Sequence, residues 1–379
     1  MTMVLTEEQT MLRKSAADFL QSQSPLDSYR TLRDQKVEQG FHADIWQQMV
    51  ALGWSGVSIP ESYEGLGFGY QGLGLILQEM GKTLCASPLL SSCLMAPKVL
   101  LDVGSEAQKK AILPQIASGH MTIALAVDEG PHHDPQSLSL KADGQGDRFS
   151  LSGHKSFVMD GGHAKKIIVA AKTSQQESDG KGITLFLLDR QTEGVHTTSL
   201  PMVDHRNMAH LAFENVVVTK DNILGKLHDG YPHLEQCLDY GRIGLAAEML
   251  GMAEGAFQMT LGWLKERRQF GVPIGTFQAL QHRASQMFCE LELGRAVVAG
   301  ALSALDQNKR HVPLLASLAK AKLGDILKLV TNETIQLHGG IGVTDEHDIG
   351  FFLKRSRILE QALGHSRYHR DRYARLKDL

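Results

Sequence analysis

Residues 265–282 read KERRQFGVPIGTFQALQH and lie between two segments that carry the period of an α-helix. Gly271 and Pro273 end the first segment, because neither residue continues a helix readily. The stretch brings an arginine, amide groups and a phenyl ring close together. An arginine fork suits a pyrophosphate, and a phenyl ring can lie against a second aromatic ring. Taken alone, the stretch also fits a helix cap followed by a turn.

Helical spacing of apolar residues extends toward both ends of the chain. On the C-terminal side it predicts four long helices with short connections, the pattern of a helical bundle, at 239–270, 276–305, 313–340 and 345–376. On the N-terminal side, Thr6 and Gln9 match a capping box ahead of a first helix. Further helices are expected from about Ala43, at 72–83 and at 106–119.

In the middle of the chain the pattern changes to short apolar runs separated by Gly, Asp, Ser and Asn, which predict an antiparallel sheet or barrel. The runs are 123–127, 149–151, 155–159, 166–171, 183–188 and 211–218. Asp143-Gly-Gln-Gly146 is interpreted as a spacer between strands. The predicted fold class is α+β, with an N-terminal helical domain (1–120), a central antiparallel β domain (121–226) and a C-terminal four-helix bundle (227–379).

The composition is that of an ordinary globular protein. The 379 residues include 39 basic and 42 acidic side chains, and a net charge of −3 argues against a nucleic-acid partner. No apolar run is long enough to predict a membrane span. The N-terminal residues lack the pattern of a secretory signal, and the four cysteines form no CxxC pair. These features predict a cytoplasmic protein.

Three other patterns are weaker. Gly67-Phe-Gly69-Tyr-Gln-Gly72 matches GxGxxG, but residues 87–101 contain no acidic residue to bind a ribose, so a plain glycine loop is favoured. His365 and His369 are four residues apart, yet a serine stands where a zinc peptidase needs glutamate. His132-His133-Asp134 lacks a further ligand group. No metal site is predicted.

Two more segments have the form of binding turns. The first reads Gln336-Leu-His-Gly339-Gly340-Ile-Gly342, and its glycines let a ligand approach the backbone closely. The second, Asp239-Tyr-Gly241-Arg242, lies near the start of a long helix. Each segment alone also fits a helix cap and a turn. Their occurrence together with residues 265–282 favours a binding site.

On these motifs the chain resembles the acyl-CoA dehydrogenase family over essentially its whole length. The order of the three predicted domains matches, and so does the phrase Leu151-Ser-Gly-His-Lys155-Ser-Phe157-Val158 in the β region. The resemblance implies an FAD-dependent oxidoreductase that introduces an α,β double bond into an acyl-CoA thioester. It also implies a flavin whose adenine and pyrophosphate reach a neighbouring subunit, and hence at least a dimer.

The resemblance implies site residues one by one. Contacts to FAD are implied at Val127, Asp128, Phe157, Arg267, Gln269, Phe270, Phe277, Gln278, Gln336, Gly339 and Gly340. Of these, Gln336, Gly339 and Gly340 match the contact with the FAD of the neighbouring subunit. Asp239 and Arg242 match contacts with acyl-CoA. The resemblance implies no metal ligands.

The implied reaction needs a carboxylate to remove the α proton while hydride passes to the flavin. The family places this base at one of two positions, which are occupied here by Gly241 and Leu363, and neither can accept a proton. Glu248, about two helical turns from Gly241, is the candidate base. The alternative for Glu248 is a buried polar group paired across a subunit interface. Glu360 is a second candidate, with a surface or ion-paired role as its alternative.

The flavin loop departs from the family pattern as well. Asp128 occupies the place of a hydroxyl that the resemblance puts beside the flavin. A negative charge at that place is expected to disfavour the reduced, anionic flavin.

Among family members, the chain looks most like the small or β-type subunits, such as the small subunit of pimeloyl-CoA dehydrogenase. Two hypotheses follow. The chain is either an active acyl-CoA dehydrogenase with a displaced base, or a catalytically silent subunit that completes an FAD site. The first implies a homo-oligomer (a dimer or tetramer), and the second a heterotetramer with another family member. An electron-transfer flavoprotein is the implied electron acceptor.

Overall fold

The computed structural model describes residues 5–174, 181–307 and 310–379. The chain divides into two compact units. The first unit contains the residues up to Asp34, Gly74–Cys85 and Arg242–Leu379, and the second contains Gln35–Leu73 and Ala86–Gly241. Among the described residues, no helix is both long enough and apolar enough to cross a membrane.

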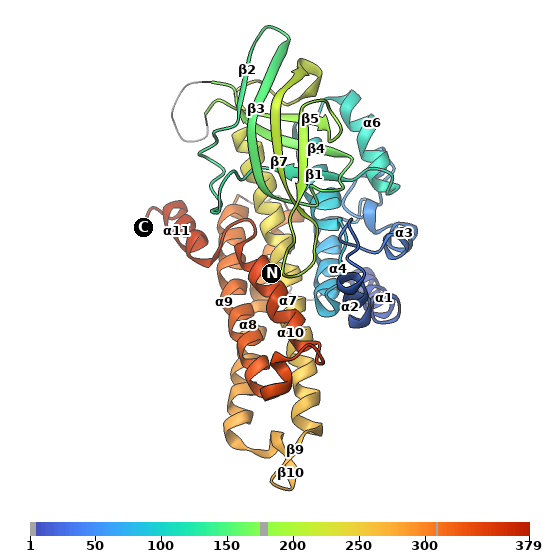
Figure 1. The fold of residues 1–379 in the computed structure, drawn as a ribbon, viewed down its shortest axis with the longest axis vertical. Coiled ribbons are helices and arrows are strands. Elements are labelled where there is room, and N and C mark those ends of the chain that lie inside the picture. The colour runs from blue at the N-terminus through green and yellow to red at the C-terminus, as the bar shows by residue number, and fades with distance from the viewer. Residues whose placement is uncertain (1–4, 175–180, 308–309) are drawn as a thin grey trace. The chain divides into compact units, whose positions relative to one another are not determined.

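A sheet forms the centre of the second unit (Figure 1). Its strands run in the order β6-β7-β3-β2-β4-β5-β8, and β1 pairs with β4. Their bounds are β1 Ile123–Ala126, β2 Lys141–Gln145, β3 Arg148–Met159, β4 Lys166–Lys172, β5 Ile183–Asp189, β6 Val195–Ser199, β7 Met208–Thr219 and β8 Ile223–Leu224. The helices of this unit are α3 (Ala43–Ala51), α5 (Ala96–Val103) and α6 (Glu106–Ala117). A central β domain is thus confirmed.

The sheet differs from the sequence prediction in four details. The runs at 149–151 and 155–159 belong to one strand, β3, whose pairing with β7 shifts register between them. Asp143 and Gly144, interpreted as part of a spacer, lie in β2 and pair with β3. Strand β1 runs parallel to β4, although the other neighbours are mostly antiparallel. Strands β2 and β6 were missed because their polar residues give no alternating apolar signal.

The core of the second unit lies between the buried faces of these strands. Buried apolar residues from β1, β3, β4, β5 and β7 contact one another there. They include Ala124, Leu151, Ile167, Phe186, Leu211 and Phe213. This rigid sheet positions the loop that follows β1.

The first unit is helical. Its helices are α1 (Glu7–Gln23), α2 (Leu26–Asp34), α8 (Gln278–Asp306), α9 (Val312–His338), α10 (Ile349–Gln361) and α11 (Ser366–Leu376). Two helices, α4 (Tyr70–Thr83) and α7 (Tyr231–Glu266), have residues in both units. The predicted capping box is present, because the side chains of Thr6 and Gln9 each accept a hydrogen bond from the backbone of the other.

The predicted helix at 345–376 is instead two helices. Helix α10 ends at Gln361 and α11 begins at Ser366. Between them Leu363 and Gly364 have φ values of 57° and 102°. A left-handed pair of residues cannot continue a right-handed helix, so the chain turns here. The sequence signal was weak because Gly364 alone marks the break.

Candidate functional site

The turn between α7 and α8 projects into solvent. Strands β9 (Arg268–Gln269) and β10 (Val272–Pro273) form a short hairpin, with Phe270 at φ 55° and Gly271 at φ 82° in its turn. Phe270 is 92% exposed, and its ring contacts Phe277 edge to face at a centroid distance of 6.2 Å. Arg267, Gln269 and Gln278 are also exposed. The turn therefore presents a cation, amides and two aromatic rings on one projection.

Trp263 and His338 bring this turn together with the glycine segment 336–342. The Arg267 guanidinium lies 5.7 Å from the Trp263 ring centroid. Trp263 in turn stacks on His338, with centroids 5.2 Å apart and ring planes at 22°. The sequence reasoning missed both residues. The available signal was the position of Trp263, one helical turn before Arg267.

His338 is buried at the end of α9 and has a defined hydrogen-bond pattern. Its Nδ1 donates to the Thr334 carbonyl oxygen at 2.7 Å, while its Nε2 has no hydrogen-bond partner among the described residues. Burial lowers the pKa of His338 below its ordinary value. The His347 ring lies 4.5 Å away, and burial lowers its pKa as well. Burial therefore favours the neutral form of both imidazoles.

The glycines after His338 leave an open backbone. A Cβ atom placed on Gly339 or Gly340 would meet nothing within 4 Å, and both residues are exposed together with Gln336. Gly339 has a φ of 67°, which a residue with a side chain adopts only with strain. This segment can therefore accept a ligand close to its backbone.

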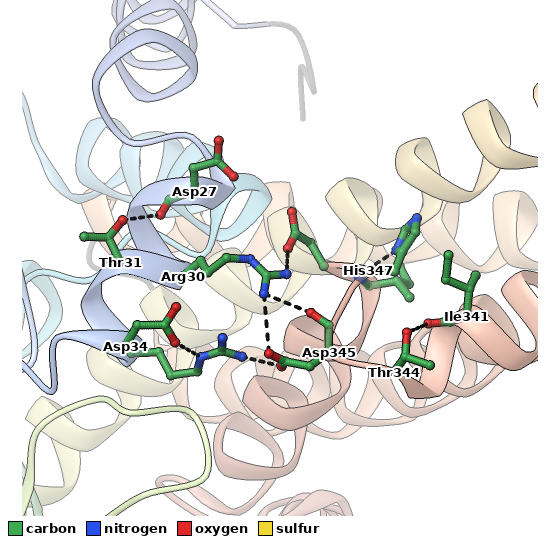
Figure 2. A network of polar contacts seen from close by, with 11 residues as sticks. Asp27, Arg30, Thr31, Asp34, Ile341, Thr344, Asp345 and His347 are labelled. Atoms are coloured by element: carbon green, nitrogen blue, oxygen red, sulfur yellow. Dashed lines mark hydrogen bonds and ion pairs between the residues drawn. The ribbon is translucent and has the colours of Figure 1, made fainter.

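Helix α2 holds the loop that follows the glycine segment (Figure 2). Arg30 forms ion pairs with Asp345 and Asp348, and Arg33 pairs with Asp345. Both guanidinium groups also lie over the Phe351 ring, at 4.8 and 5.0 Å from its centroid. Hydrogen bonds to Asp34 and Asp345 raise the pKa of Arg33 above its ordinary value. The loop is thus anchored on one side by α2.

In the second unit, Val127, Asp128 and Phe157 lie together. The loop after β1 runs along β3, where the Ser156 N–H donates to the Asp128 carbonyl oxygen at 2.7 Å. The Lys155 ammonium donates to the Val127 carbonyl oxygen at 2.8 Å. Phe157 follows directly, with a φ of 52° and a side chain that is 45% exposed. An exposed aromatic ring thus stands beside this loop.

Asp128 is not an isolated charge. Both of its carboxylate oxygens lie 2.9 Å from Nδ1 of His133 in the same loop. From the sequence, Asp128 is expected to be a bare negative charge, and the His132-His133-Asp134 segment is only a weak metal-site pattern. The two residues are five positions apart, which is neither a helical nor a strand spacing, so the sequence did not indicate the pair.

Arg242 is fully buried and contacts the break between α10 and α11. Its Nε donates to the Leu363 carbonyl oxygen at 3.3 Å, and its guanidinium lies 5.8 Å from the Tyr368 ring centroid. Nε2 of His369 lies 3.0 Å from the same carbonyl oxygen. The backbone of Leu363 is therefore held in place by two buried basic side chains.

Lys320 is a further buried base beside this break. Its ammonium donates to the carbonyl oxygen of Leu359 at 2.8 Å, in the last turn of α10. Burial, followed by the nearby Arg242 guanidinium, lowers the pKa of Lys320 to about 7. Burial and the same guanidinium also lower the pKa of His369. The sequence reasoning missed Lys320, because nothing local marks a lysine of α9 as buried.

The two candidate bases both lie in ion pairs. Oε1 of Glu248 lies 2.9 Å from Nη2 of Arg355, and the two side chains are 6% and 5% exposed. Oε2 of Glu360 lies 3.8 Å from Nη1 of Arg357. Glu248 is thus a buried polar group whose ion pair with Arg355 joins two helices of the chain.

No group of three or more His, Cys, Asp or Glu side chains that could hold a metal ion occurs in the part of the chain that the structure describes. The two histidines four residues apart have other contacts. Nδ1 of His365 accepts a hydrogen bond from the Tyr368 N–H at the start of α11, and His369 contacts the Leu363 carbonyl oxygen.

Domain models of a single protein family match successive parts of the chain. The N-terminal domain model of acyl-CoA dehydrogenase matches residues 6–120, the middle domain model matches 126–216, and the C-terminal domain model matches 228–376. The chain belongs to the acyl-CoA dehydrogenase family. As a family member it is an oxidoreductase-type flavoprotein, and its cofactor is FAD.

Similar proteins include relatives of nearly equal length. A probable acyl-CoA dehydrogenase YngJ of Bacillus subtilis is 32% identical, with 98% of each chain covered. A caffeyl-CoA reductase-Etf complex subunit CarC of Acetobacterium woodii is 30% identical, with 94% of each covered. A solved Tcur3481-Tcur3483 steroid ACAD variant matches with a TM-score of 0.87 and 28% identity over 98% of each chain.

The residues of this acyl-CoA dehydrogenase family member fit FAD in the first unit. Arg267 offers a guanidinium fork to a pyrophosphate, and the exposed Phe270 and Phe277 rings offer faces to an adenine. The open backbone at Gly339 and Gly340 leaves room that no side chain of the described chain fills. The donors and the space therefore agree with the cofactor of the family.

Proposed function

We propose that this chain acts in the α,β-desaturation of an acyl-CoA thioester as an FAD-dependent acyl-CoA dehydrogenase. The observation that carries the proposal is the contact chain Arg267–Trp263–His338, which joins the two segments expected to hold FAD. The bound flavin supplies the hydride acceptor of the reaction. The residues of the chain bind and orient the flavin, and they exclude water from it.

The proposed cofactor contacts form two groups. Arg267, Gln269, Phe270, Phe277 and Gln278 hold the pyrophosphate and adenine. Gln336, Gly339 and Gly340 approach the FAD of a neighbouring subunit through their exposed backbone and amide. In the second unit, Val127, Asp128 and Phe157 lie at the flavin. Asp239 and Arg242 contact acyl-CoA.

The proton acceptor distinguishes two candidate functions. Gly241 and Leu363 carry no acid–base group at the two places where the family has its base. Glu248 on α7 is the candidate base, but its carboxylate is engaged in a buried ion pair with Arg355. This observation favours a second candidate function, in which the chain is a silent subunit that completes an FAD site with a partner family member.

The proposal extends to partners. The apolar side chains of the α7–α8 turn and of α8 are exposed, which is typical of a surface that another subunit covers. They are Phe270, Val272, Phe277, Phe288 and Leu293. We infer an oligomer, and for the silent-subunit candidate a heterotetramer. The relative named as a subunit of a caffeyl-CoA reductase-Etf complex supports an electron-transfer flavoprotein as the redox partner, which acts as the electron acceptor in the dehydrogenase direction.

Purifying the chain alone and with candidate partners separates the two functions. An active dehydrogenase binds FAD alone, and its flavin spectrum bleaches anaerobically with acyl-CoA. Bleaching that is lost in Glu248→Gln, in protein that keeps its flavin and its fold, supports Glu248 as the base. A silent subunit binds FAD without bleaching, or binds it only with a partner. A chain that never binds flavin, alone or with a partner, contradicts both candidates.

Arg267→Ala tests the cofactor assignment directly. Loss of a charge-assisted contact of about 1.5–3 kcal/mol weakens FAD binding by about 10- to 150-fold. Arg268→Ala is the matched control, because Arg268 is also exposed and its guanidinium makes a long hydrogen bond of 3.5 Å to the Gly271 carbonyl oxygen. Equal flavin content in the two variants would count against the assignment.

A further inference from the structure

The pair formed by Asp128 and His133 is the feature that the proposed function leaves unexplained. His133 Nδ1 lies equidistant from both carboxylate oxygens, and the His133 side chain is only 4% exposed, against 23% for Asp128. A carboxylate only accepts hydrogen bonds, so Nδ1 carries a proton in this contact. The Nε2 proton is then the one that distinguishes the neutral imidazole from the imidazolium.

The backbone around this pair is held by a second ion pair. Oε1 of Glu129 accepts from the Lys155 ammonium at 2.7 Å and from the Leu140 N–H at 3.0 Å. Oε2 of Glu129 accepts from the Ser139 N–H. Since Val127 and Asp128 are also bonded to β3 through their carbonyl oxygens, both ends of the loop are anchored. His133 therefore meets a carboxylate with a defined position.

The other charged and titratable groups near the pair lie on β3 and in the loop after β1. Lys155 on β3 and Glu129 in the loop carry opposite charges and cancel each other. His154 on β3 contacts the Glu129 carbonyl oxygen at 2.9 Å through Nε2, and His132 and Asp134 of the loop are exposed. The Lys155 side chain also acts on Asp128 at longer range, whereas His133 contacts the Asp128 carboxylate directly. The pair carries one negative charge when His133 is neutral and none when it is protonated.

We propose that His133 compensates the charge of Asp128 beside the flavin, so that the proton on His133 couples pH to reduction of the cofactor. This inference rests on the proposed function, which places Asp128 and the adjacent Phe157 at the flavin. Reduction adds negative charge to the flavin region, and a bare carboxylate there opposes it. By reciprocity, reduction strengthens proton binding to His133. The hydroxyl that the family has at this position lacks this coupling.

The test measures the reduction equilibrium of the bound flavin against a reference dye, from about pH 5.5 to about pH 8.5. In His133→Gln we expect flavin reduction to be disfavoured about 5- to 150-fold relative to the unmodified protein at the acid end, with the difference shrinking toward the alkaline end. In Asp128→Asn we expect easier reduction at the alkaline end and a weaker pH dependence. His132→Gln, an exposed neighbour, is the control and keeps the original profile.

The outcomes separate this inference from the proposed function. A His133→Gln protein that binds FAD with the pH profile of the unmodified chain overturns the inference and leaves the proposed function standing. A chain that binds no FAD in any assembly overturns both. If His133→Gln unfolds, the Asp128→Asn profile decides, because an unchanged pH dependence there also overturns the inference. NMR titration of labelled His133, with and without the Asp128 carboxylate, detects the pair itself.

Discussion

Buried basic side chains contact the backbone at and just before Leu363. Its carbonyl oxygen contacts Arg242 and His369, its φ is already left-handed, and Lys320 holds the preceding turn. We propose that position 363 is one of the two base positions of the family, occupied here by a leucine in place of a carboxylate.

Leu363→Glu is expected to introduce a proton acceptor at this position. If the chain is silent, acyl-CoA-dependent flavin bleaching should rise by about 10²- to 10⁴-fold, the usual contribution of a general base. The rate is measured by anaerobic stopped-flow absorbance. Leu363→Gln is the control of equal shape, because an amide cannot take the proton. Equal rates in the two variants would show that position 363 does not carry the base.

Glu248 and Arg355 form an ion pair that is almost fully buried. Glu248→Gln removes the carboxylate that balances the guanidinium, which is expected to cost about 3 kcal/mol of unfolding free energy. Urea denaturation measures the loss. Glu333→Gln, which breaks the exposed pair with Arg283, should change stability by less than about 1 kcal/mol. Similar losses in both variants would contradict the role of burial.

At the scale of elements, two helices of the first unit approach through glycines. A Cβ on Gly251 of α7 would lie 1.7 Å from the Gln78 carbonyl oxygen of α4, and one on Gly81 would lie 2.2 Å from the Glu248 carbonyl oxygen. Backbone oxygens inside helices cannot move aside without breaking hydrogen bonds. The two helices therefore pack only because both contacts lack side chains.

Gly251→Ala should accordingly lower the free energy of unfolding by about 3 kcal/mol or more, since overpacking of a rigid contact forces the helices apart. Thermal unfolding followed by circular dichroism measures this. Gly262→Ala on the same helix is the control, because its Cβ meets nothing within 4 Å. That change should be neutral or stabilise by up to about 1 kcal/mol. A stable Gly251→Ala protein would refute the close approach.

Lys320 makes the stability of the bundle depend on pH. Its pKa is about 7 in the folded chain against 10.5 for an ordinary lysine, so the unfolded chain binds more protons between these values. Stability should rise with pH across this window, with a slope from this group of at most about 1.4 kcal/mol per pH unit. Below about pH 7 both states are protonated, and the slope from Lys320 vanishes.

Lys320→Met should flatten this rise, because the methionine does not titrate. Urea unfolding at several pH values within the window measures the slope. Lys322→Met is the control, since Lys322 lies on the same helix but is partly exposed and paired with Glu290. An unchanged slope in Lys320→Met would mean that another group is responsible.

At the scale of the whole molecule, the projecting α7–α8 turn indicates assembly. Phe270→Glu replaces an exposed ring with a charge, and covering a phenyl group is worth about 1.5–3 kcal/mol. We expect the subunit dissociation constant to increase by about 10- to 150-fold, as measured by sedimentation velocity over a concentration series. Met11→Glu, at an exposed apolar residue of α1, should leave assembly unchanged. Identical sedimentation of all three proteins would argue against this surface as an interface.

The sequence alone determined the features that depend on near neighbours. The capping box at Thr6 and the turn at 265–282 were predicted because each follows from residues within about two helical turns of one another. The same holds for the alternation of helical and β regions, which gave the fold class. The motif residues Arg267, Phe270 and Gly339 were likewise recognisable from the local order of residues in the sequence.

Only the tertiary structure decided which distant side chains meet. Trp263 stacks on His338, Glu248 pairs with Arg355, and Lys320 reaches the end of α10, and each contact joins residues on different helices. His133 reaches Asp128 because hydrogen bonds to β3 anchor the loop. Periodicity reports which face of an element is apolar, but it carries no information about which polar group another element places opposite. Burial and charge pairing, and so the chemistry of the site, arise only when the elements pack.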